Sequence, residues 1–222
     1  YSNNDIWYNT SYISRNITSI YENKEILLSA KILEAKILLG RMEMTQANEL
    51  LNQCLVSPDK TKAKWEAWIT MAEIYEYSSN NVDAYIIYEK IFNECKKNLP
   101  TAWKARIRMG ERKAQIPEEK KYAYTIFKDV INSNHSFTQE RLVANFYINN
   151  ISINEFIKQM KLLRPDNYSY LIYCTRKAIL EYNSFEAQKY LAAMKTHGLQ
   201  NSWHQILLET LIKDIKIGYN FK

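Results

Sequence analysis

Glycine and proline are scarce in this sequence, with only four of each among 222 residues. All-β folds use both residue types in their many tight turns, so the scarcity counts against such folds. It favours long helices that are joined by short polar turns. So few glycines also leave no glycine-rich loop of the kind that binds phosphates.

Cysteine and histidine are rarer still, with three of each. Cys54, Cys95 and Cys174 lie far apart, without the spacing of a disulfide framework or a metal site. Each falls in or beside an apolar helical stripe, so we expect small core residues in an intracellular, reducing compartment. His135 and His197 have no Cys, Asp or Glu at ligand spacing. We therefore expect no catalytic residue, no cofactor and no metal ion.

Long apolar runs are also missing. None approaches the roughly 20 residues that a membrane span needs, and the longest, from Ile26 to Leu39, is interrupted by charged residues. We expect no membrane span. The formal charge is +6 and the isoelectric point about 9.0, which permits an acidic protein, RNA or an anionic surface as partner.

A repeated pattern is what the sequence does contain: a small residue followed by apolar residues three, four and seven positions later. These offsets place four side chains on one face of a helix. Clear copies begin at Ala47, Ala84, Ala123 and Ala187, and a degenerate copy begins at Ile153. Their mean separation is about 35 residues, close to the roughly 34 of tetratricopeptide-class helix–turn–helix repeats.

Each copy is preceded by another amphipathic segment, and polar or proline-containing breaks separate the segments. We therefore predict an all-α fold: a right-handed α-solenoid of about six helix–turn–helix repeats, with a compact irregular bundle as the alternative. The whole chain, 1–222, is expected to be one domain. It would have an N-terminal helix or cap at 1–27, repeats at 28–200 and a capping helix at 201–222.

The segment from 68 to 100 resembles a tetratricopeptide repeat. That family places a large residue, a small residue and a Tyr on its first helix, a small residue and an aromatic on its second, and a proline late in the repeat. The matching residues are Trp68, Ala72, Tyr75, Ala84, Tyr88 and Pro100. The same stretch is similar to the half-a-tetratricopeptide repeat of RNA-processing scaffolds, through Trp68, Met71, Ala72 and Glu76, with Trp103 and Glu111 repeating the Trp and Glu.

The segment from 167 to 200 is similar to a pentatricopeptide repeat, through Tyr168, Leu171, Ile172, Phe185, Ala187, Met194, Gly198 and Leu199. Members of that family bind single-stranded RNA at one base per repeat. The resemblance implies base-reading positions near Ser169 and Ser202. It also implies, as for tetratricopeptide repeats, that the first helix of each pair lines a concave face.

Lys104, Arg108 and Arg112 form a basic row at i, i+4 and i+8 of the first helix expected at 101–113. Neighbouring like charges cost a helix a few tenths of a kcal/mol per pair, so an acidic segment, a terminal carboxylate or phosphates would explain the row. The alternative is a solvated face balanced by carboxylates of the preceding first helix, namely Glu66, Glu73 and Glu76.

We predict a non-catalytic protein–protein interaction scaffold that binds a protein or peptide, acidic ones included, in a solenoid groove. RNA binding by a pentatricopeptide-like solenoid is the alternative. The residues predicted to contact the partner are those expected on the concave face: Lys104, Arg108, Arg112, Glu73, Tyr77, Ser169 and Arg176.

Overall fold

The fold is all-α. The computed structural model describes residues 24–56, 61–165, 168–197 and 202–217, and these contain eleven α-helices and no strand. Five are the first helices of pairs: α2 (Lys24–Gly40), α4 (Lys62–Tyr77), α6 (Pro100–Ala114), α8 (Thr138–Tyr147) and α10 (Ser169–Leu180). α12 (Trp203–Ile217) follows the last pair, has no second helix among the described residues and is counted below with the first helices. Five are second helices: α3 (Met44–Leu55), α5 (Asn81–Glu94), α7 (Lys120–Asn132), α9 (Ile153–Leu163) and α11 (Ser184–Thr196). A short 3₁₀ helix, η1 (Pro117–Glu119), precedes α7.

Most of the cap predicted at 1–27 and the last five residues of the helix predicted at 201–222 lie outside the described residues. None of the described helices is both long and apolar enough to cross a membrane. The three cysteines are buried and free, as predicted for small core residues.

The predicted apolar stripes all lie on second helices. Ala47, Ala84, Ala123 and Ala187 each occupy the fourth position of their helix and are at most 2% exposed. In α9 that position is Phe156, which is fully buried, so the degenerate copy is aligned on Phe156 and not on Ile153. The small residue lets paired helices approach closely, whereas in the α8–α9 pair a phenyl ring fills the space.

Four of the five turns within pairs share one backbone geometry. Each has a residue in the left-handed region, with φ between 55° and 65°. Each also has a hydrogen bond from the following amide N–H to a carbonyl five residues back, as from Asn80 to Tyr75. This is the bonding of a Schellman C-cap. The turn between α6 and α7 differs and contains η1. The four left-handed residues are Met42, Ser79, Asn149 and Tyr182.

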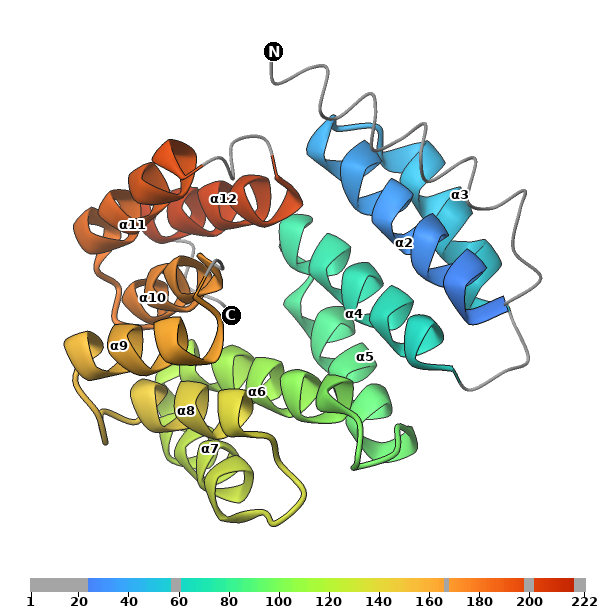
Figure 1. Cartoon of the computed structure of the whole chain (residues 1–222). Coiled ribbons are helices and arrows are strands. Elements are labelled where there is room, and N and C mark those ends of the chain that lie inside the picture. Colours follow the sequence, from blue (N-terminus) through green and yellow to red (C-terminus); the bar gives the residue numbers. More distant parts are fainter. Residues whose placement is uncertain (1–23, 57–60, 166–167, 198–201, 218–222) are drawn as a thin grey trace.

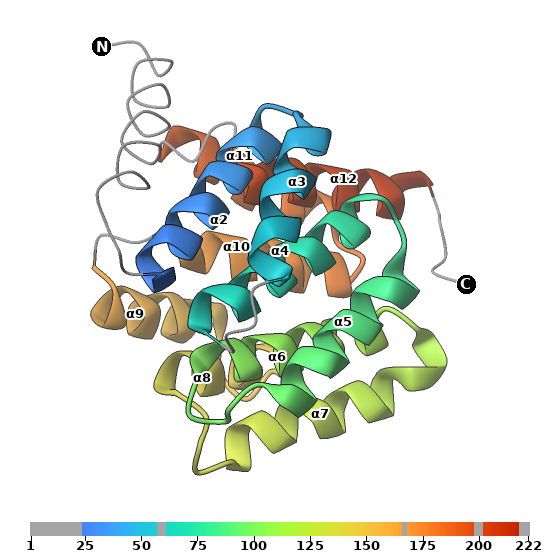
Figure 2. The ribbon, with the colours of Figure 1, turned by 90° about the vertical axis from the view of Figure 1, so that its right-hand side faces the viewer.

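Helices that follow one another in the chain pack against one another, and first helices also contact one another, as α2 does α4, α4 does α6, and α6 does α8. In Figure 1 the helices follow a curved path, and its end returns to its beginning because α12 packs against both α4 and α2. Figure 2, seen from the side of α2 and α3, places these two helices at the upper end and α7 at the lower end. The first helices therefore surround a common interior.

Candidate functional site

The interior between the first helices contains a network of ionised side chains. We define the interior network as Glu76 of α4, Arg108, Glu111 and Arg112 of α6, and Arg176 of α10, none more than 5% exposed. Arg108 donates from Nη1 to both carboxylate oxygens of Glu111, at 2.8 and 2.7 Å. The Nε of Arg112 lies 3.4 Å from Oε1 of Glu76. These charges are paired with one another and are not exposed to solvent.

Arg176 connects α10 with two other first helices. Its Nη1 donates to Oε2 of Glu111 at 3.0 Å, and its Nη2 donates to Oε2 of Glu76 at 3.1 Å. Two buried phenols also donate to these carboxylates: Tyr88 donates to Glu76 at 3.2 Å, and Tyr147 donates to Glu111 at 2.8 Å. Side chains of α5, α6, α8 and α10 are thus held to the carboxylates of Glu76 and Glu111.

The electrostatics favour this arrangement at neutral pH. Burial alone would raise the pKa of the Glu111 carboxyl, but Arg108 and Arg176 outweigh burial and hold that pKa below its ordinary value. Burial, together with the nearby carboxylates, raises the pKa of Tyr88 and of Tyr147 well above the usual range. The carboxylate therefore stays charged and the phenols stay neutral, as these hydrogen bonds require.

A second buried carboxylate, that of Glu73, lies beside the network and contacts α12, where burial lowers the pKa of His204 to about 3 and so keeps its imidazole neutral. The Trp203 indole N–H donates to Oε2 of the fully buried Glu73 at 3.2 Å, and Nε2 of His204 lies 3.9 Å from its Oε1. Burial alone would raise the pKa of Glu73, but nearby cations, Lys104 and Lys36 among them, lower it to about 2. α12 is thereby attached to α4 through a charged acceptor.

The interior opens at one end into a cavity of about 330 Å³, which we call the mouth cavity. The first turns of α4, α6, α8, α10 and α12 converge there, since the lining includes Lys62, Pro100, Thr101, Gln139, Ser169 and His204. Each helix N-terminus carries roughly half a positive charge. The remaining wall comes from Glu66, Lys104, Arg108, Glu140, Arg164, Ile172 and Tyr173. Five helix ends therefore face one polar space.

Two exposed cations at this cavity, Lys62 and Arg164, form no ion pair within the described residues, although the charge of Arg164 acts on the Glu140 carboxyl. Lys104, by contrast, lies 4.0 Å from Glu66, whose other oxygen accepts from Thr101 at 2.7 Å. Unpaired charge at the cavity is available to a ligand.

The structure divides the predicted contact residues into two groups. Lys104, Arg108 and Ser169 line the mouth cavity. The remaining four pack elsewhere in the interior: Arg112 and Arg176 in the network, Glu73 against Trp203 and His204, and Tyr77 with its ring 5.5 Å from that of Trp203.

The basic row is neither a free surface nor a solvated face. Glu66 and Glu76 of the preceding first helix do balance it, as the alternative reading expected, but Arg108 and Arg112 are 2% and 5% exposed. Arg108 and Arg112 are enclosed together with Arg176 of α10, which shares their carboxylate partners, whereas Lys104 is partly exposed. A partner could reach Arg108 at the cavity floor, whereas Arg112 is enclosed.

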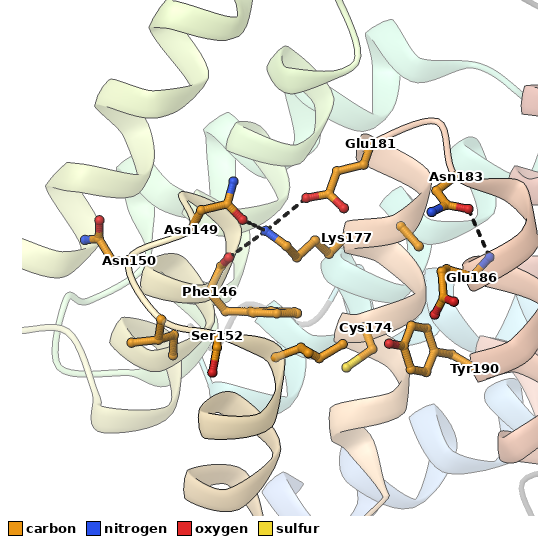
Figure 3. A pocket seen from close by; sticks show the side chains of 13 residues that line it. Phe146, Asn149, Asn150, Ser152, Cys174, Lys177, Glu181, Asn183, Glu186 and Tyr190 are labelled. Atoms are coloured by element: carbon orange, nitrogen blue, oxygen red, sulfur yellow. Dashed lines mark hydrogen bonds and ion pairs between the residues drawn. The ribbon is translucent and has the colours of Figure 1, made fainter.

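A second cavity, of about 520 Å³, lies between the α8–α9 turn and the α10–α11 turn (Figure 3). Lys177 projects into it and is fully occupied: its Nζ donates to the Phe146 carbonyl at 2.8 Å and to Asn149 Oδ1 at 2.6 Å, and lies 3.2 Å from Glu181. Asn183 at its rim caps α11 by accepting from the Glu186 amide. Because these polar groups bond to one another, this cavity is a weaker candidate than the mouth cavity.

Among the residues of the mouth cavity that sequence reasoning missed, three are charged: Lys62, Glu140 and Arg164. Lys62 and Glu140 lie in the first turns of helices, and Arg164 directly follows α9. The sequence could have predicted the first two from their place at the starts of helices. When helices repeat at similar intervals and stack side by side, their first turns lie at the same end of the stack. No group of three or more His, Cys, Asp or Glu able to hold a metal ion occurs among the described residues.

Comparison of the chain with models of known protein families, with curated proteins and with solved structures found no match.

Proposed function

We propose that this protein is a non-catalytic scaffold that binds a segment of a partner protein in the mouth cavity. The observation that carries the proposal is the convergence of five helix N-termini on one cavity whose rim holds the unpaired cations Lys62 and Arg164. Ile172 and Tyr173 give the same wall an apolar part. Polar groups around a partly apolar wall are typical of a site that orients a ligand.

The proposal includes a fold of right-handed α-solenoid type, related to the tetratricopeptide-like repeats. Three features support it: helix starts spaced at 31 to 39 residues, four turns with the same C-cap, and contacts between successive first helices. Solenoids of this kind bind by presenting extended inner surfaces. Here the inner surface is closed along much of its length, so the mouth cavity is the part of it that we assign to the partner.

RNA is the alternative partner, favoured by the charge of +6 and by Ser169 in the cavity wall. One observation weighs against it. The guanidinium groups that phosphates would need along the groove, those of Arg112 and Arg176, bind buried carboxylates.

The test is a comparison of partners purified from the source cells with two variants. Ser169→Phe fills the cavity wall, and Thr125→Phe makes the same kind of change on the exposed face of α7. We expect at least one protein to be recovered with the unchanged chain and with Thr125→Phe but to be lost with Ser169→Phe. Circular dichroism melting must show both variants folded. If the two variants recover the same proteins, the mouth cavity is not the binding site.

A further inference from the structure

The mouth cavity has a surplus of positive charge, and that surplus specifies the partner. Four cations line it, against the two carboxylates Glu66 and Glu140. Lys104 is matched by Glu66 within the cavity, and Arg108 is matched by Glu111 behind it. What remains is two cations, Lys62 and Arg164, against the single carboxylate of Glu140, a surplus of one positive charge. The five helix ends add further positive potential.

Arg108 at the cavity floor has hydrogen-bonding capacity left over. The residue is 2% exposed, and both of its side-chain hydrogen bonds within the described structure are made by Nη1. Its buried Nε–H has no acceptor among the described residues. An unsatisfied buried donor costs about 1–3 kcal/mol, and an acceptor that enters the cavity near this group would lower that cost.

Glu140 is the carboxylate with which a basic partner would have to pair, and it is poorly placed to do so. Its Oε2 is shielded from solvent and has no hydrogen-bond partner in the described structure. Burial raises the pKa of this carboxyl, which weakens its hold on charge. A lysine or arginine of a partner would be repelled by Lys62, Lys104 and Arg164, which line the same cavity.

We propose that the mouth cavity binds an acidic segment of a partner protein, with a carboxylate held between Lys62 and Arg164 above the Arg108 guanidinium. This inference rests on the proposed function and adds the chemistry of the bound segment. Charge-assisted contacts of this type are about twice as strong as neutral hydrogen bonds. They also confer a strong preference for one sign of charge.

The test measures binding of three fluorescein-labelled probes by fluorescence anisotropy: a glutamate-rich peptide, a lysine-rich peptide of the same length, and an oligouridylate. The variants are Lys62→Glu, Arg164→Glu and Glu140→Gln. The matched control is Lys158→Glu, which makes the same charge reversal at an exposed position of α9 away from the cavity. We expect the glutamate-rich peptide to bind best. Each of the first two reversals should weaken it roughly tenfold, equivalent to about 1.4 kcal/mol, and the control should not.

Glu140→Gln decides the sign. Removal of its charge should strengthen binding of the glutamate-rich peptide or leave it unchanged, and a weakening would overturn the inference. Tighter binding of the lysine-rich peptide than of the glutamate-rich peptide would also overturn it. The inference fails as well if the oligouridylate binds more tightly than the glutamate-rich peptide and if Lys62→Glu and Arg164→Glu weaken the binding of the oligouridylate. These results leave the proposed function standing if Ser169→Phe still loses cellular partners. If Ser169→Phe loses none, the proposed function itself fails.

Discussion

The guanidinium group of Arg176 lies 3.1 Å from the carboxylate of Glu76, which is 100 residues earlier in the chain. Both side chains are at most 2% exposed. The contact joins α10 to α4, two helices that are not neighbours in the order of the chain. It shows that charged side chains, and not only apolar ones, hold the two ends of the helix path together.

We expect Arg176→Met to destabilise the protein by about 3–5 kcal/mol, because the buried carboxylates of Glu76 and Glu111 lose a shared partner. The free energy of unfolding from urea titration measures the loss. Lys158→Met removes an exposed cation of α9 and should change stability by less than about 0.5 kcal/mol. An equal effect of the two substitutions would contradict the importance of the buried pairs.

Stability should fall as the pH is lowered from about 5 towards 2. The carboxyl groups of Glu73, Glu111 and Glu66 all have pKa values below their ordinary range in the folded protein, and that of Glu73 is about 2. The unfolded chain therefore binds more protons than the folded chain in this window, so acid favours unfolding. The stability that these carboxylates contribute is fully present at pH values above their pKa in the unfolded chain. It is lost as the pH falls through their pKa in the folded protein.

Thermal unfolding followed by circular dichroism across this pH range checks the prediction. Glu73→Gln should flatten the pH profile, since it removes a carboxyl group whose pKa in the folded protein is about 2. Glu140 has the opposite shift, because burial raises its pKa. Glu140→Gln should therefore increase stability at neutral pH and leave it little changed in acid. A profile unaffected by both substitutions would argue against this account.

Gly110→Ala should destabilise the protein although alanine is the better helix former. An added Cβ would lie 2.6 Å from Cε1 of Phe127, whose ring is buried and packs edge-on against Tyr147 at 5.4 Å. Overpacking of this kind costs typically about 1–3 kcal/mol, more than the roughly 1 kcal/mol that alanine contributes to the helix.

A double-mutant cycle provides the control for Gly110. In the background of Phe127→Leu, which shortens the opposing side chain, the cost of Gly110→Ala should shrink or reverse. Additive effects of the two substitutions, measured by chemical denaturation, would show that the close approach of α6 and α7 is not the cause.

Met42→Gly should be more stable than Met42→Ala by about 1 kcal/mol. Met42 has φ 65° in the turn between α2 and α3, and a Cβ in this left-handed region costs roughly 1–2 kcal/mol. Comparison of the glycine with the alanine variant removes the effect of losing the half-exposed methionine side chain. Urea denaturation of the pair measures the difference, and equal stabilities would mean that the turn is not strained.

The helices and their buried faces could be read from the sequence because each is determined locally. Apolar spacing marked α3, α5, α7 and α11, and polar or proline-containing breaks fell at their boundaries. The alignment of α9 failed because Phe156 stands where the other copies have Ala, and a pattern defined by a small residue cannot recognise a large one. Whether a large or a small side chain fits at this position depends on the helix that packs against it, and the local sequence does not show that.

The burial of the basic row could not be predicted from the sequence. Spacing placed Lys104, Arg108 and Arg112 on one face and identified the carboxylates of the preceding helix. Their burial depends on Arg176, which arrives from α10 and shares Glu76 and Glu111. A pairing over 65 to 100 residues depends on the curvature of the whole path. The paired glutamates of the half-a-tetratricopeptide resemblance are these two acceptors.

The return of α12 to α4 and α2 has a consequence for how the molecule comes apart. A row of helix pairs that touched only their neighbours could fray from either end and could be shortened one pair at a time. Here, removal of α10 to α12 would expose Glu73, Glu76 and Glu111. These carboxylates would lose the hydrogen bonds that Arg176 and Trp203 donate to them. The chain should therefore unfold in a single transition, and versions that lack α10 to α12 should fail to fold stably.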